Sequence, residues 1–224
     1  MPLRGAVFDI DGVIVDSEPL HFRSLHDALL EEGVRITREE YWGSYLAYDD
    51  REAIRLALEQ HGQAAAPEQL ARIEGVKAAR FAELIPQIPV FDGAPELVRA
   101  LASEVPVAIA SGARHDEIEA ILTGLGLRDA FSALVGADDV ARTKPDPAPY
   151  LEALRQLGQA TAGLRPDECV AFEDSVPGIA SALGAGMRVV GVANSYPPEK
   201  LRSAHRVVGS LSGLAMRELR ALFS

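Results

Sequence analysis

The stretch Phe8-Asp9-Ile10-Asp11-Gly12-Val13 places two carboxylates directly after a short apolar run, Ala6-Val7-Phe8. Residues two apart in a β-strand lie on the same side, so Asp9 and Asp11 leave the predicted first strand together. Two carboxylates this close repel each other unless a divalent cation or a shared proton offsets their charge. The stretch therefore indicates either a catalytic site with a hard metal ion or a solvated turn, because Asp and Gly are common in turns.

Short apolar runs with β-branched residues recur along the chain, each followed by a Gly, Asp or Ser loop and a helical pattern. The later runs are Val105 to Ala110, Ala133-Leu134-Val135, Val170-Ala171-Phe172, Val189 to Val192 and Val207-Val208. Strands that alternate with helices predict an α/β fold, a Rossmann-like three-layer domain whose parallel sheet is covered on both faces. Open sheets of this kind bind ligands at the carboxyl ends of their strands, so we expect the functional residues there.

Residues 17–89 break this rhythm. They show four helical patterns with no convincing strand between them: Pro19–Gly33, Arg38–Leu46, Arg51–Gly62 and Pro67–Ile85. Segments that contain proline flank the region on both sides, as linkers between domains often do. We predict an α/β core domain of residues 1–16 and 90–224 with an inserted helical cap domain of residues 17–89; the alternative is a single domain with extra helices.

Polar residues follow three further predicted strands: Ser111-Gly112-Ala113, Thr143-Lys144-Pro145 and Glu173-Asp174-Ser175. A hydroxyl and backbone N–H groups ahead of a helix suit phosphate oxygens, and a second acidic pair suits a divalent cation. Each segment alone also fits a helix cap or a plain loop. Together they supply what phosphoryl transfer needs: a nucleophile, cations and donors for the phosphoryl oxygens, and an acid for the leaving oxygen.

Charge and composition exclude several other classes. A formal net charge of −11 over 224 residues predicts neither nucleic-acid binding nor attraction to an anionic membrane. The chain shows no apolar run of about 18 residues and no signal-peptide core at its start, so we expect a cytoplasmic protein. Its single cysteine, Cys169, lies in an apolar run and is expected to be a buried structural thiol.

The motifs, in this order, resemble those of the haloacid dehalogenase superfamily. Within it, they are similar to the CbbY-like subgroup of phosphatases and β-phosphoglucomutases, in which a helical cap follows the first strand. The resemblance covers nearly the whole chain and is carried by Asp9-x-Asp11-Gly12-Val13, Ser111, Lys144-Pro145 and Glu173-Asp174-Ser175. It is specific for the superfamily and much less so for the substrate.

The resemblance implies a catalytic role for each matching residue. Asp9 would attack phosphorus and form an aspartyl-phosphate, and Asp11 would protonate the leaving alcohol and then activate water. Ser111, Gly112 and Lys144 would bind the oxygens of the transferred phosphoryl group.

The same resemblance implies a Mg²⁺ cofactor. The ion would be held by the carboxylates of Asp9 and Asp174 and by the backbone carbonyl of Asp11, with Glu173 as a further ligand or a support for the others. A dehalogenase would need no metal and would not be expected to keep Asp11.

The cap is expected to select the substrate. His21 and Lys77 match residues of the β-phosphoglucomutases and favour a sugar phosphate, although His21 also fits a helix residue at the domain interface and Lys77 a solvated helix face. In the loop from Tyr45 to Arg51, Asp50 takes the place of the mutase's phosphate-binding arginine, unless a shift of one residue brings Arg51 there. An acid at that place would repel a second phosphate.

We therefore predict a monomeric phosphatase of small phosphorylated metabolites. An intramolecular phosphomutase of the β-phosphoglucomutase type is the nearest alternative. Two non-enzymatic alternatives are a phospho-accepting receiver domain, which is about half this length and has no cap, and a phosphate-binding protein that has lost turnover.

Overall fold

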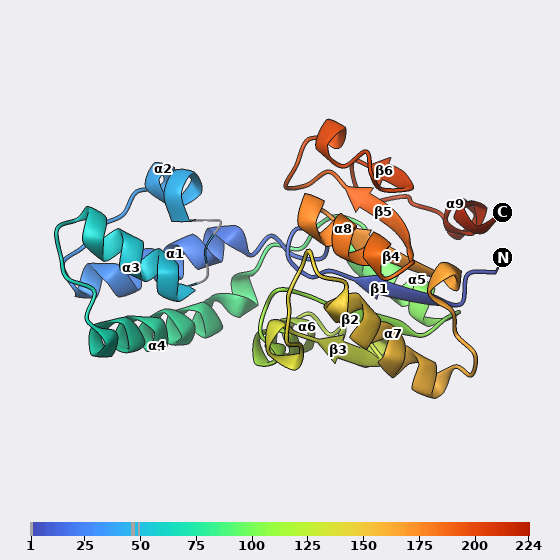
Figure 1. The fold of residues 1–224 in the computed structure, drawn as a ribbon, viewed down its shortest axis with the longest axis horizontal. Coiled ribbons are helices and arrows are strands. Elements are labelled where there is room, and N and C mark those ends of the chain that lie inside the picture. The colour runs from blue at the N-terminus through green and yellow to red at the C-terminus, as the bar shows by residue number, and fades with distance from the viewer. Residues whose placement is uncertain (1, 46–47, 49) are drawn as a thin grey trace. The chain divides into compact units, whose positions relative to one another are not determined.

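The computed structural model describes the chain except for residues 1, 46, 47 and 49. Its contacts divide the chain into two compact units (Figure 1). We call residues 1–16 and 89–224 the core unit, and residues 17–88 the helical unit.

The core unit is built on a six-stranded parallel sheet of order β3-β2-β1-β4-β5-β6. Its strands are β1 (Gly5–Phe8), β2 (Val107–Ala110), β3 (Ala133–Val135), β4 (Cys169–Glu173), β5 (Arg188–Val192) and β6 (Arg206–Val208). The sheet confirms the predicted α/β fold, and each strand coincides with an apolar run. Strand β1 lies between β2 and β4, so the chain after Phe8 emerges in the middle of the sheet.

Helices cover the sheet of the core unit. They are α5 (Ala94–Ala102), α6 (His115–Gly124), α7 (Ala148–Ala160), α8 (Val176–Gly184) and the short α9 (Met216–Arg220), with 3₁₀ turns at Arg128–Ala130, Ala137–Asp139, Pro166–Glu168, Pro198–Lys200 and Ala221–Phe223. Helices α7 and α8 share a buried apolar cluster with one face of the sheet, including Val7 and Ala171. On the other face Phe8 stacks on Phe172, with ring centroids 4.3 Å apart. Figure 1 shows α7 and α8 on one side of the sheet and α5 and α6 on the other.

The helical unit has an apolar core of its own. Its helices are α1 (Glu18–Glu31), α2 (Arg38–Glu40), α3 (Asp50–Gln60) and α4 (Pro67–Leu84), with a π-helical turn at Tyr41–Tyr45 and a 3₁₀ turn at Ile85–Gln87. The helix predicted over Arg38–Leu46 is thus α-helical only in its first turn, and Leu46 lies outside the described residues. Thr37 and Glu40 cap that turn reciprocally, and Gly43 in the following turn disfavours a regular helix.

Candidate active site

The carboxyl ends of β1 and β4 bring three carboxylates together. Asp9 follows β1, Glu173 is the last residue of β4, and Asp174 follows it. All three are buried, and one carboxylate oxygen from each lies within 4.8 Å of the others. This convergence follows from the direct pairing of β1 with β4, which aligns Phe8 with Phe172.

Lys144 lies among these carboxylates, although it comes from the segment ahead of α7. Its Nζ is 3.0 Å from Oδ1 of Asp9 and 2.5 Å from Oε1 of Glu173. Burial alone would lower the pKa of Lys144, but the attraction of the two carboxylates outweighs burial, so its pKa is raised. The lysine is therefore charged at neutral pH.

Glu173 is fully buried and its two oxygens accept four hydrogen bonds. Oε1 accepts from Lys144 Nζ at 2.5 Å and from the Tyr150 hydroxyl at 2.9 Å, while Oε2 accepts from the Ser175 backbone N–H at 3.2 Å and from its hydroxyl at 2.9 Å. Two bonds to each oxygen use its lone pairs. A Cβ on Gly178 would lie 1.9 Å from Oε1, so only glycine fits beside this carboxylate. This geometry favours Glu173 as a support that orients Lys144.

Asp9 and Asp174 both have raised pKa values. Burial is the largest cause for Asp9, and the like charges of Glu173, Asp174 and Asp11 add to it against the opposing charge of Lys144. Burial and the charge of Glu173 raise the pKa of Asp174 to about 7. Among the described residues of the cluster, three buried carboxylates thus surround one ammonium group. A hard divalent cation such as Mg²⁺ would offset this excess of negative charge, so the donor set fits that cofactor.

Gly12 joins the turn after β1 to this cluster. Its φ is 75°, and a Cβ there would lie 1.9 Å from Oδ2 of Asp174 and 2.8 Å from Oγ of Ser195. Asn194 donates from Nδ2 to the Gly12 carbonyl at 2.8 Å, and the Ser195 hydroxyl lies beside the Asp174 carboxylate next to Gly12. The half-buried Asp11 lies in the same turn, and its charge contributes to the raised pKa of Asp9.

Ser111 and Gly112 follow β2, beside β1 in the sheet. Ser111 is buried; its backbone N–H donates to the Val135 carbonyl at 3.0 Å, and its Oγ accepts from the Ala113 N–H at 3.1 Å. The hydroxyl hydrogen of Ser111 therefore remains to donate to another group. Gly112 is exposed, and a Cβ on it would meet none of the described atoms within 4 Å. The turn thus leaves room for an external ligand.

Sequence reasoning missed Tyr150, Asn194 and Ser195. The last two had a usable signal, since they follow the apolar run of β5 just as the predicted site residues follow other strands. Tyr150 had no such signal, because an aromatic residue in a helix that packs on a sheet is expected at any core position.

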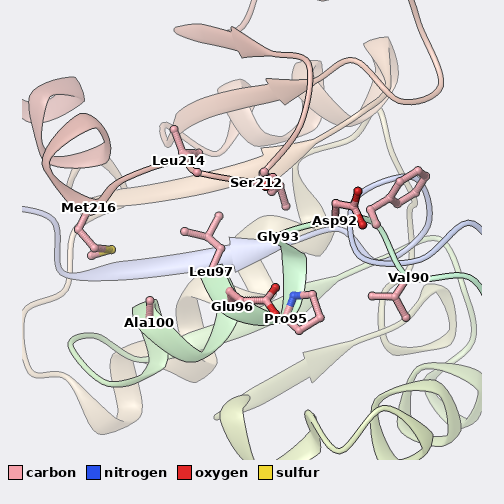
Figure 2. A pocket seen from close by; sticks show the side chains of 13 residues that line it. Val90, Asp92, Gly93, Pro95, Glu96, Leu97, Ala100, Ser212, Leu214 and Met216 are labelled. Carbon is pink, nitrogen blue, oxygen red and sulfur yellow. The ribbon is translucent and has the colours of Figure 1, made fainter.

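A cleft of about 690 Å³ in the core unit lies elsewhere, between α5 and the segment 211–216. Figure 2 shows apolar side chains in its lining, including Leu97, Leu214 and Met216, together with the acidic side chains of Asp92 and Glu96. No candidate catalytic residue lines it. We therefore do not assign the chemistry to this cleft, since it combines no nucleophile with a cation.

In the helical unit, His21 and Lys77 lie together with Asp50. Lys77 is buried, with only 1% of its surface exposed, and its Nζ is 2.7 Å from Oδ2 of Asp50 and 3.0 Å from Nδ1 of His21. The His21 ring stacks on Phe81 at 4.2 Å between centroids. Burial and the charge of Lys77 lower the pKa of His21 to about 3, so the imidazole is neutral and accepts from Lys77 through Nδ1.

Arg51 pairs with Glu74 at 2.8 Å. Both Asp50 and Arg51 therefore have partners of opposite charge within the helical unit. Leu46, Ala47 and Asp49, which belong to the same predicted loop, lie outside the described residues.

The part of the chain that the structure describes contains no helix both long and apolar enough to span a membrane. A family model described as haloacid dehalogenase-like hydrolase matches residues 3–186. The chain belongs to the haloacid dehalogenase-like hydrolases. This confirms the family and the hydrolase class that the four motifs predicted.

Individual members of the haloacid dehalogenase-like family also match the chain over most of its length. Protein CbbY of Rhodobacter capsulatus is 31% identical over 204 residues, 88% of this chain and 88% of the relative. Fructose-1-phosphate phosphatase YqaB of Escherichia coli strain K12 is 32% identical over 193 residues, 84% of this chain and 95% of the relative. The crystal structure of CbbY from Rhodobacter sphaeroides in complex with phosphate is 29% identical, with a TM-score of 0.83 over 97% of this chain and 99% of that one. These similarities confirm the CbbY-like subgroup.

Proposed function

We propose that this hydrolase is a Mg²⁺-dependent phosphatase that cleaves small phosphate monoesters, with sugar phosphates as the substrate class. The buried cluster of Asp9, Glu173 and Asp174 around Lys144 carries the proposal, because it combines a nucleophile, a fixed cation and carboxylates for a metal ion. The phosphatase name of the relative YqaB and the phosphate bound to the CbbY structure support the same class.

In the proposed first step, Asp9 attacks phosphorus. Its Oδ1 accepts a hydrogen bond from the Ile10 N–H at 2.9 Å and forms an ion pair with Lys144 Nζ at 3.0 Å, which leaves Oδ2 for the attack. An O–P bond forms as the bond from phosphorus to the ester oxygen breaks, and Asp11 gives a proton to that oxygen. Lys144 and the Ser111 hydroxyl hold the phosphoryl oxygens.

In the second step, water hydrolyses the aspartyl-phosphate. Asp11 takes a proton from the water as its oxygen attacks phosphorus, and Asp9 leaves as a carboxylate with release of inorganic phosphate. The Asp9 and Asp174 carboxylates and the Asp11 backbone carbonyl would hold Mg²⁺, which when bound would offset charge on the phosphoryl oxygens. Glu173 keeps Lys144 in place during both steps.

The helical unit supports a monoester as the substrate. We propose that it is a cap that recognises the leaving group, as in capped members of the family. Asp50 is an acid that already pairs with Lys77, and Arg51 pairs with Glu74, so the two side chains offer no unpaired positive charge for a second phosphate. This favours a phosphatase over a mutase that must grip a bisphosphate.

The test is release of inorganic phosphate from a panel of sugar phosphates, phosphoglycolate, nucleotides and p-nitrophenyl phosphate, with and without Mg²⁺. We expect Mg²⁺-dependent release that Asp9→Asn abolishes and that Asp129→Asn, the same change at an exposed position of the core unit, leaves intact. Absence of release from every ester, together with isomerisation of β-glucose 1-phosphate, would replace the phosphatase with a mutase.

A further inference from the structure

The loop after β5 reaches the candidate metal site from outside the four motifs. Its backbone is anchored to the sheet, because the Ala193 N–H donates to the Val208 carbonyl at 2.9 Å and the Asn194 N–H to the Val192 carbonyl at 2.9 Å. Two adjacent side chains, Asn194 and Ser195, project from this anchored turn to different parts of the site.

Three segments meet at Gly12. The missing Cβ of Gly12 lets the Asp174 carboxylate approach the turn after β1, and the Ser195 hydroxyl lies beside the same point. Asn194 holds the Gly12 carbonyl at 2.8 Å, one residue beyond Asp11. The loop after β5 therefore contacts the turn after β1 and lies beside the Asp174 carboxylate.

The two acidic residues after β4 are held in different ways. Both oxygens of Glu173 accept hydrogen bonds, from Lys144, Tyr150 and Ser175. Asp174 lies beside the Ser195 hydroxyl instead, because its Oδ2 and the Ser195 Oγ would be 1.9 Å and 2.8 Å from the same Cβ position on Gly12. Partners that orient a ligating carboxylate typically change metal affinity by about 10- to 100-fold when removed.

We propose that Ser195 and Asn194 are positioning residues for the Mg²⁺ site. Ser195 orients the Asp174 carboxylate, and Asn194 fixes the turn that carries Asp11. This rests on the proposed function, because it assigns the two side chains to the metal site of that function. Ser195 is exposed, so loss of its hydroxyl should change metal binding without unfolding the protein.

Isothermal titration of the full chain with MgCl₂, without substrate, tests the proposal. We expect Ser195→Ala to raise the Kd for Mg²⁺ about 10-fold, with the melting temperature in EDTA unchanged. Ser195→Thr keeps the hydroxyl and should restore the affinity. Ser203→Ala, the same change at another exposed serine of the core unit, should bind Mg²⁺ as the wild type does.

Asn194→Ala provides a second variant and should also weaken Mg²⁺ binding, through the turn that contains Gly12. Wild-type affinity in both Ser195→Ala and Asn194→Ala would overturn the inference and leave the proposed phosphatase untouched. A wild-type protein that binds no Mg²⁺ would instead overturn the metal dependence of the proposed function, and this inference with it.

Discussion

Replacement of Lys144 by methionine tests the charge balance of the candidate site most directly. The side chain of Lys144 is only 11% exposed, and those of its partners Asp9 and Glu173 are 11% and 0% exposed. Removing one partner of a buried ion pair typically costs about 3–5 kcal/mol, because the remaining charge stays buried without compensation. For a chain of this size about 4 kcal/mol corresponds to a fall in melting temperature of roughly 8–16 °C.

The destabilisation of Lys144→Met should depend on pH in a defined direction. Asp9 and Asp174 already have raised pKa values, and loss of the lysine raises that of Asp9 further, since Lys144 opposes its increase. A carboxyl group whose pKa is raised in the folded state binds its proton more tightly in the folded than in the unfolded chain. The stability that this proton contributes is lost as pH rises through the raised pKa. We therefore expect a larger loss at pH 8 than at pH 5.5.

Calorimetry in EDTA measures this loss, because the single tryptophan, Trp42, lies in the helical unit and does not report on the sheet. Lys200→Met, at an exposed lysine over the Tyr196 ring, is the matched control and should change stability by less than about 0.5 kcal/mol. Phosphate release by Lys144→Met should fall at least about 100-fold. Equal effects of the two substitutions, or a loss that grows as pH falls, would refute the reasoning.

Three further predictions concern other parts of the chain. Because the pKa of His21 is lowered to about 3 in the folded helical unit, His21 is protonated below pH 6.5 only in the unfolded chain, so the stability of the unit should fall by up to about 1.4 kcal/mol per pH unit as the pH decreases. His21→Gln should flatten this slope in urea unfolding followed by tryptophan fluorescence. Gly12→Ala adds a Cβ 1.9 Å from an oxygen of Asp174 and should abolish phosphate release. Gly213 is the matched control, because its φ of 74° is nearly the same and a Cβ there would meet no described atom within 4 Å; Gly213→Ala should cost only the backbone strain of about 1–2 kcal/mol and retain activity. Tyr150→Phe removes a buried hydroxyl that bonds the glutamate of the site and should destabilise the core unit by about 2 kcal/mol in urea unfolding followed by circular dichroism.

The strands could be predicted because their physical signal is strong. A parallel strand covered on both faces must be apolar throughout, and the residues of β1, β2 and β4 are all buried. The convergence of Asp9 with Asp174 then follows from topology alone. The different roles of Glu173 and Asp174 do not follow from topology, because they depend on hydrogen-bond donors such as Tyr150. The sequence gives no reason to place Tyr150 next to Glu173.

Lys77 shows where a pattern was available and was misread. A solvated helix face was one interpretation of this residue, and it is wrong, because Lys77 is buried on α4 with Ile73 and Phe81. The spacing of these three residues, four apart, places the lysine on the apolar stripe of the helix. A lysine on such a stripe requires a partner for its charge, which the structure identifies as the exposed Asp50.

The central place of β1 in the sheet has a consequence for how the protein is made. Its neighbours β2 and β4 are encoded far downstream, whereas all contacts within the helical unit come from one continuous segment. At about 5–20 residues per second, a ribosome needs roughly 10–30 s to travel from Asp9 to Glu173. During that interval β1 lacks its neighbour β4, and no metal site exists. We therefore expect the helical unit to fold on the ribosome first, and Mg²⁺ loading to wait until β4 has emerged.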